Sequence, residues 1–239
     1  MTHLLNGERV RQASSTLLHD RKDILDSYQI GVFASELSSL PFGLTNSVYM
    51  PFDKLSAKYG GNEEDAPYKF RMSKAAMAAI LIHNTMPCLW RMHFGIFDKI
   101  VRIYDKFEVP QAKFIGYWEN PAKVLKGRNI YVSVYRHLRE DRLLAVIGHV
   151  GKEHLDQDIE IAFDSGKLAV KNLRQAVEKM TQPDPEYEEL FKLRKENRVP
   201  EVRAPLELGD FGSKVQSFRG DILKMHLDFH SFAIVELSQ

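Results

Sequence analysis

The segment that decides the fold runs from Asn129 to Gly148 and has the sequence NIYVSVYRHLREDRLLAVIG. It contains two apolar runs, 130–135 and 142–148, on either side of the charged turn 138–141. Both runs are rich in β-branched and aromatic residues, and a side-chain period of two is typical of strands. A short charged connection between such runs joins antiparallel neighbours. The segment therefore predicts an antiparallel β-hairpin.

Strand patterns continue toward the C-terminus. Three further apolar runs lie at 158–163, 221–228 and 231–237. The polar stretch 176–202 contains three prolines and predicts either a helix around 187–196 or a long insertion. We expect residues 128–239 to form an antiparallel β-sandwich domain with this stretch as its interruption.

The residues before this domain follow a different pattern. The alanine-rich segment 71–84 and the amphipathic segment 96–107 predict two helices. The next segment, 112–121, predicts a strand whose aromatic end enters a loop. A strand that follows a helix in this way is typical of a parallel βαβ unit. We therefore predict an α/β segment over residues 1–127, and an α/β plus all-β fold for the chain.

Composition limits the classes of function. The chain has 239 residues and a formal net charge of +1, so no long-range field favours nucleic acid or an anionic membrane. It has no apolar run of about 20 residues and no signal-peptide pattern, which predicts a soluble protein without a membrane partner. Glycine motifs for nucleotides and the Gly-x-Ser-x-Gly element of acyl hydrolases are absent from the sequence. We expect no cofactor.

Two carboxylates are candidate catalytic residues. Glu8 lies just beyond a short predicted strand, where barrel enzymes carry catalytic side chains, and Glu119 lies at the end of the predicted strand 112–121. Two such carboxylates can protonate a leaving group and attack or activate water. Glu36 is a further candidate. On spacing alone, the favoured interpretation of Glu8 is one exposed carboxylate among 32 acidic residues.

Aromatic residues offer a second kind of site. Tyr117 and Trp118, together with Trp90 and His93, would present aromatic faces and polar groups that suit a sugar ring. An equally weighted alternative is that both tryptophans pack between the two predicted domains. The sequence does not decide between these interpretations.

Other reactive side chains favour structural roles. His83 follows a very apolar helix, where a histidine is more often structural than a base. The series His226, Asp228 and His230 alternates as metal ligands can, but no further ligand cluster accompanies it. Cys88 is the single cysteine and lies in an apolar context, which indicates an inert thiol. We therefore predict no metal site.

Five short segments resemble a known family. They are HLLNGE at 3–8, LPFG at 40–43, AILIHN at 79–84, FIGYWE at 114–119 and VSVY at 132–135. They are similar to the last third of large bacterial glycoside-hydrolase-like proteins, a group similar to the family 123 glycosidases. These proteins combine a (β/α)8 barrel with a C-terminal β-sandwich. The resemblance implies that Glu8 faces a carbohydrate site, with Asn6, Tyr117 and Trp118 as binding residues.

The same resemblance exposes a deficit. A complete barrel needs about 250 residues, whereas residues 1–127 are all that precede the predicted sandwich. The prediction is therefore a partial (β/α)8-type barrel followed by an antiparallel β-sandwich. A partial barrel would present two unpaired strand edges, so we expect self-association through those edges.

Three hypotheses of function follow. The leading one is the C-terminal portion of a glycoside-hydrolase-like protein that cleaves glycosidic bonds by carboxylate chemistry, with the activity of the isolated chain left open. The alternative is a non-catalytic carbohydrate-binding or interaction module, in which aromatic residues hold the glycan. A third hypothesis treats the first half as a scaffold whose partner chain supplies the missing strands.

Overall fold

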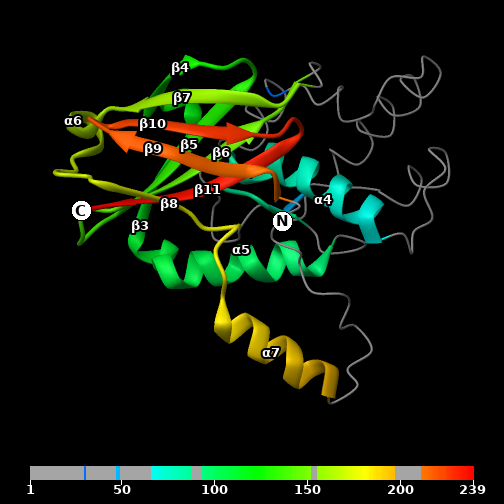
Figure 1. The fold of residues 1–239 in the computed structure, drawn as a ribbon. Coiled ribbons are helices and arrows are strands. Elements are labelled where there is room, and N and C mark those ends of the chain that lie inside the picture. The colour runs from blue at the N-terminus through cyan, green and yellow to red at the C-terminus, as the bar shows by residue number, and fades with distance from the viewer. Residues whose placement is uncertain (1–29, 31–46, 49–65, 88–92, 152–154, 197–210) are drawn as a thin grey trace.

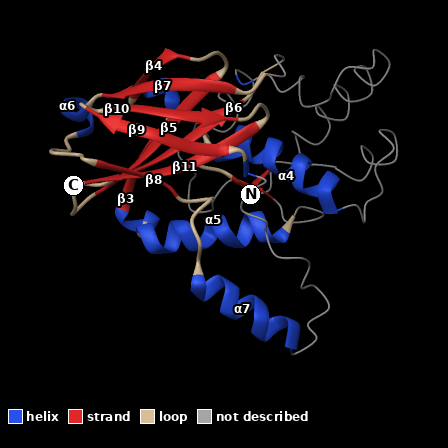
Figure 2. Ribbon diagram, in the orientation of Figure 1, coloured by secondary structure: helices blue, strands red, loops and turns tan. Residues whose placement is uncertain are grey.

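A computed structural model describes residues 30, 47–48, 66–87, 93–151, 155–196 and 211–239. These residues form three layers: a five-stranded sheet lies between a four-stranded sheet and two helices. Figures 1 and 2 show the two sheets above the long helix α5 (Phe94–Phe107). The candidate site described below lies at an edge of this sandwich.

The central sheet is antiparallel throughout. Its strands, in spatial order, are β3 (Ala112–Ile115), β5 (Ile130–His137), β6 (Leu143–His149), β11 (Ser231–Ser238) and β8 (Gln175–Glu178). In the hairpin that β5 and β6 form, Ser133 lies opposite Val146. This pairing confirms the hairpin predicted from 129–148.

The outer sheet completes the sandwich. Its strands, in spatial order, are β4 (Ala122–Lys126), β7 (Gln157–Phe163), β10 (Ile222–Leu227) and β9 (Ser213–Arg219). Its inner face contributes Ile161, Leu223 and Met225 to a core shared with the central sheet, and all three are fully buried. The predicted antiparallel β-sandwich is therefore present.

Helices cover the opposite face of the central sheet. Helix α4 (Ala66–Leu81) lies against β6 and β11, and its alanines let the two backbones come close. A methyl group added at Gly148 would lie 2.4 Å from the Ala78 carbonyl oxygen. Strand β6 is consequently buried on both faces, with Leu144 and Val146 toward the helices and Ala145 toward the outer sheet. Among the described helices, none has the length and apolar character needed to cross a membrane.

Shorter elements connect these layers. They are the parallel pair β1 (Ser47–Val48) and β2 (Met86–Pro87), the 3-10 turns η2 (Val109–Gln111) and η3 (Tyr117–Glu119), and the helices α6 (Ser165–Leu168) and α7 (Pro185–Glu196). Helix α7 lies beyond α5 (Figure 1). Just before α7, the buried carboxylate of Asp184 pairs with Arg102 at 2.9 Å and Lys106 at 3.1 Å, both on α5.

The predicted partial barrel is wrong. The described part of the chain is mostly antiparallel sheet and shows no (β/α)8 pattern. Strand β3 was expected to run parallel to its neighbour, but it pairs antiparallel with β5. The physical reason lies at the end of α5, where Glu108 adopts the left-handed conformation and η2 turns the chain back toward the edge of the central sheet.

This correction affects two further expectations. The boundary predicted after residue 127 stays a prediction, although β3 and β4, which precede it, are strands of the two sheets. The self-association expected from open barrel edges loses its structural basis, because it was derived from the barrel.

Candidate functional site

A pocket of about 910 Å³ lies at one edge of the sandwich, where β4 of the outer sheet approaches β5 of the central sheet. Its apolar lining comes from side chains that border the sandwich core: Ala122, Val124, Ile130, Val132 and Phe163. Its polar lining is formed by Tyr117, Asn120, Lys123, Tyr131, Asp164, Ser165 and Asp221. The pocket therefore combines apolar side chains with hydrogen-bonding and charged groups.

Two turns hold the carboxylates of the pocket in place. Asp164 precedes the one-turn helix α6 and accepts a hydrogen bond at Oδ1 from the backbone N–H of Lys167, at 2.9 Å. Asp221 occupies the β9–β10 turn with φ 63°, and its Oδ2 accepts a 2.6 Å hydrogen bond from Ser165 Oγ. Its carbonyl oxygen also accepts from the Phe163 N–H at 2.9 Å. Both side chains are thus fixed at the end of β7.

The aromatic side of the pocket is anchored to the helical layer. The Tyr117 N–H donates to Ser133 Oγ at 2.9 Å, and this hydroxyl donates in turn to the Ile82 carbonyl at 2.6 Å. The ring of Tyr117 meets that of Tyr131 edge to face, with centroids 5.2 Å apart. Ser133 is fully buried on β5, so one side chain connects the end of α4 to the pocket.

A buried histidine fixes the hydroxyl of Tyr117. His83 Nδ1 lies 2.7 Å from the Ala79 carbonyl oxygen, so Nδ1 carries the proton and Nε2 accepts. The Tyr117 hydroxyl, 3.3 Å from Nε2, is therefore the donor. Burial lowers the pKa of His83 to about 4, which keeps the ring neutral at neutral pH. Burial, together with Tyr131, raises the pKa of Tyr117 to about 12.

The structure brings only some of the predicted site residues to this pocket. Tyr117 lines it, and Trp118 is its neighbour, stacked on His83 with centroids 5.9 Å apart. Glu119 is exposed and is not among the lining residues, because its carboxylate accepts from the Gly116 N–H at 3.2 Å. His93 is buried at the start of α5 against Phe70 and is also outside the lining. Further predicted residues lie outside the described part of the chain: Asn6, Glu8, Glu36, Cys88 and Trp90.

Several lining residues were not predicted from the sequence, among them Tyr131, Asp164 and Asp221. Tyr131 belongs to the predicted strand 130–135, but the alternation of side chains along this strand did not indicate which of its two faces would meet a ligand. Asp164 and Asp221 lie in tight turns after β7 and before β10, and turn chemistry alone could have placed them at the ends of strands. Their proximity depends on the β7–β10 pairing, in which Ala162 lies opposite Ile222.

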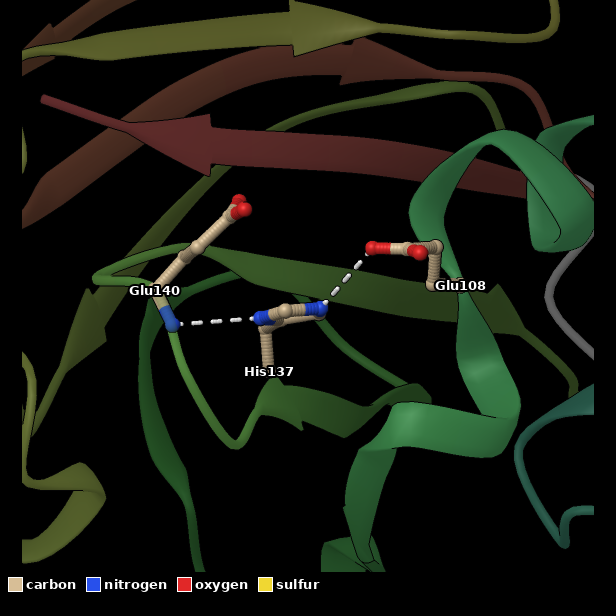
Figure 3. Close-up of side chains that lie close together, drawn as sticks. All are labelled: Glu108, His137 and Glu140. Atoms are coloured by element: carbon tan, nitrogen blue, oxygen red, sulfur yellow. Dashed lines mark hydrogen bonds and ion pairs between the residues drawn. The ribbon is translucent and has the colours of Figure 1, made fainter.

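A cluster of Glu108, His137 and Glu140 has the composition of a metal site but the wrong proton arrangement (Figure 3). His137 is buried, and its Nδ1 accepts from the backbone N–H of Glu140 at 3.1 Å. The proton of the neutral ring is therefore on Nε2, which faces Glu108 Oε2 at 3.4 Å and has no lone pair for a cation. Arg142 already pairs with Glu140 at 2.6 Å and with Glu108 at 3.4 Å. We conclude that this cluster is a structural ion-pair network.

A second cluster joins Asp156, His226 and Asp228 near the other end of β10. His226 Nδ1 lies 3.0 Å from Asp158 Oδ1, and this hydrogen bond is the main cause of the lowered pKa of Asp158. The other ring nitrogen lies 3.5 Å from Asp228, which also faces Lys74 at 3.6 Å. Asp228 thus has a cationic partner in Lys74, and Asp158 has a hydrogen-bonding partner in His226. His230, predicted beside them as a candidate ligand, instead contacts the Gly151 carbonyl at 2.8 Å.

The chain matched no protein-family model, no curated protein and no solved structure. The proposed function is therefore based on the pocket at the β4–β5 edge.

Proposed function

We propose that this chain binds carbohydrate in the pocket at the β4–β5 edge, as the β-sandwich portion of a glycoside-hydrolase-like protein. The observation that carries the proposal is that two tyrosines, two aspartates, a serine, an asparagine and a lysine line one pocket. A pyranose has an apolar C–H face that packs on aromatic rings and hydroxyls that need hydrogen-bonding partners. A pocket of about 910 Å³ is within the range that holds small ligands.

The resemblance noted in the sequence supports the same class of ligand. Its two most specific segments, 114–119 and 132–135, each contribute a residue to the pocket, Tyr117 and Val132. These segments are joined directly by the hydrogen bond from the Tyr117 N–H to Ser133 Oγ. The relationship to glycoside-hydrolase-like proteins stays part of the proposal.

The geometry favours binding over hydrolysis. A glycosidase needs two carboxyl groups on either side of the scissile bond, one of which donates a proton. The predicted acid Glu119 is outside the pocket lining. Asp164 and Asp221 already accept hydrogen bonds from the chain, at 2.9 and 2.6 Å, an arrangement that suits them to hold hydroxyls as acceptors. We therefore favour the non-catalytic module over the enzyme.

Isothermal titration calorimetry with a panel of neutral oligosaccharides tests the proposal. At least one member should bind, and Tyr131→Ala should weaken it by about tenfold, equivalent to about 1.4 kcal/mol. Phe229→Ala is the matched control, because Phe229 lies beyond the opposite end of β10, where its ring contacts His230. Equal loss in both variants, or no binding by any oligosaccharide, would contradict the proposal.

An assay with chromogenic aryl glycosides separates binding from catalysis. The binding module predicts no release of the aryl group above that of the Asp164→Asn/Asp221→Asn double variant. Turnover that the double variant abolishes would favour the enzyme hypothesis instead.

A further inference from the structure

We propose that the pocket selects sugars that donate hydrogen bonds, amino sugars above all, and rejects acidic sugars. This inference rests on the proposed carbohydrate function and names the ligand class of the same site. Two hydroxyl groups of the pocket already use their protons within the protein, and carboxylates outnumber ammonium groups in its lining.

Two hydroxyls of the pocket have their protons directed into the protein. The Tyr117 hydroxyl donates to His83 Nε2, because His83 uses its own proton on the Ala79 carbonyl. The Ser165 hydroxyl donates to Asp221 Oδ2 at 2.6 Å. Toward a ligand, both oxygens therefore offer lone pairs rather than protons.

The carboxylates add acceptors and negative charge. Asp164 and Asp221 line the pocket together and have no proton to donate when ionised. Asn120, Lys123 and Tyr131 remain able to donate, but the acceptor oxygens of Tyr117, Ser165 and the two carboxylates outnumber these donor residues. A ligand rich in donors fits this set, and a ligand carboxylate would face two like charges.

Two lysines offset this charge only in part, because the pocket lining has two carboxylates and one ammonium group. Lys123 also lines the pocket, but it is exposed and lies between Ala122 and Val124, which pack toward the sandwich core, so strand alternation turns its side chain toward the outer face. The Lys167 ammonium is held by the backbone carbonyls of Glu119 and Asn120. An ammonium group on the sugar would meet two carboxylates, which attract cations.

The two turns allow charge to be removed without disturbing the fold. Asp221→Asn keeps an oxygen for the Ser165 hydroxyl, and asparagine tolerates the left-handed conformation found there. Asp164→Asn keeps the N-cap of α6, since asparagine caps helices as well as aspartate. Thermal melts of both variants should match that of the parent protein.

The test uses methyl glycosides that differ in one group, titrated into the full chain and followed by NMR line shifts. The gluco and galacto series each supply a neutral sugar, its 2-amino form and its uronate. In slightly acidic, low-salt buffer the amino sugar should bind about fivefold tighter than the neutral sugar, and the uronate at least tenfold weaker. Salt should reduce the amino-sugar preference.

The variants decide whether the carboxylates cause this order. In Asp164→Asn/Asp221→Asn the affinities for the neutral sugar, the amino sugar and the uronate should converge to within about twofold of one another, whatever loss of affinity all three share. Neutral binding with no charge preference, or a preference that persists in the double variant, would overturn this inference and leave the carbohydrate function standing. Absence of binding by every sugar would overturn both.

Discussion

Removal of one hydroxyl at Ser133 should loosen the connection between the helices and the pocket. This side chain is fully buried and accepts from the Tyr117 N–H at 2.9 Å while it donates to the Ile82 carbonyl at 2.6 Å. Ser133→Ala leaves both backbone groups without this partner in a region closed to water. The change therefore removes two hydrogen bonds and creates no large cavity.

The expected cost follows from these two groups. A buried polar group that loses its partner costs about 1–3 kcal/mol, and two of them predict a loss of about 3 kcal/mol in the free energy of unfolding. Ser231→Ala is the matched control, since Ser231 is equally buried but its hydroxyl makes one longer hydrogen bond, 3.3 Å to the Phe211 carbonyl. We expect a loss of about 1 kcal/mol there.

Urea denaturation followed by circular dichroism measures both changes. The result that supports the account is a clearly larger loss for Ser133→Ala than for Ser231→Ala, with the slope of free energy against urea unchanged. A loss below about 0.5 kcal/mol for Ser133→Ala would refute the hydrogen-bonded connection between Ile82 and Tyr117.

Three further perturbations test other parts of the structure. Gly148→Ala should destabilise the protein by about 3 kcal/mol in a thermal melt, since its methyl group would lie 2.4 Å from the Ala78 carbonyl oxygen. Gly220→Ala is the control and should cost about 1 kcal/mol, because its methyl group would have no atom within 4 Å and only the φ of 56° is unfavourable for alanine. Burial lowers the pKa of His83 from 6.5 to about 4, so the contribution of His83 to the free energy of unfolding is complete above pH 6.5 and is lost as pH falls toward 4, by up to about 3 kcal/mol. His83→Gln should remove this part of the pH dependence of stability, and an unchanged dependence in the variant would contradict the prediction. Asp184→Asn should speed amide hydrogen exchange in α7 with little change in global stability, because the substitution weakens the ion pairs that join Asp184 to α5. Unchanged hydrogen exchange in α7 would show that other contacts hold this helix.

Periodicity predicted much of the sandwich and its long helices. The β5–β6 hairpin followed from its apolar runs, and the amphipathic pattern at 96–107 corresponds to α5. Strand β9 was missed because it is an edge strand with exposed polar residues such as Lys214 and Gln216, so its pattern is weak.

The direction of β3 could not be predicted in the same way. A strand after a helix has the same local sequence whether its partner runs parallel or antiparallel, and only the partner, here β5, decides. The unbroken apolar run of β6 suited a parallel strand equally well. It is apolar throughout because helices cover one face of the central sheet and the outer sheet covers the other.

A site residue was predictable only where one segment showed both a suitable side chain and the end of a predicted strand. Tyr117 was found because an aromatic residue ended a predicted strand. Asp164 and Asp221 were not, since each alone is a turn residue and their meeting requires the pairing of β7 with β10. The role of His83 also depended on tertiary structure, because the Tyr117 hydroxyl that it fixes comes from a distant segment.

A crystal structure of the full chain with a bound amino-sugar oligosaccharide tests the central claim most directly. The account predicts a sugar ring against Tyr117 and Tyr131, with its amine facing Asp164 and Asp221 at the β4–β5 edge. A sugar bound on another face of the sandwich, with this pocket empty at saturating ligand, would contradict it.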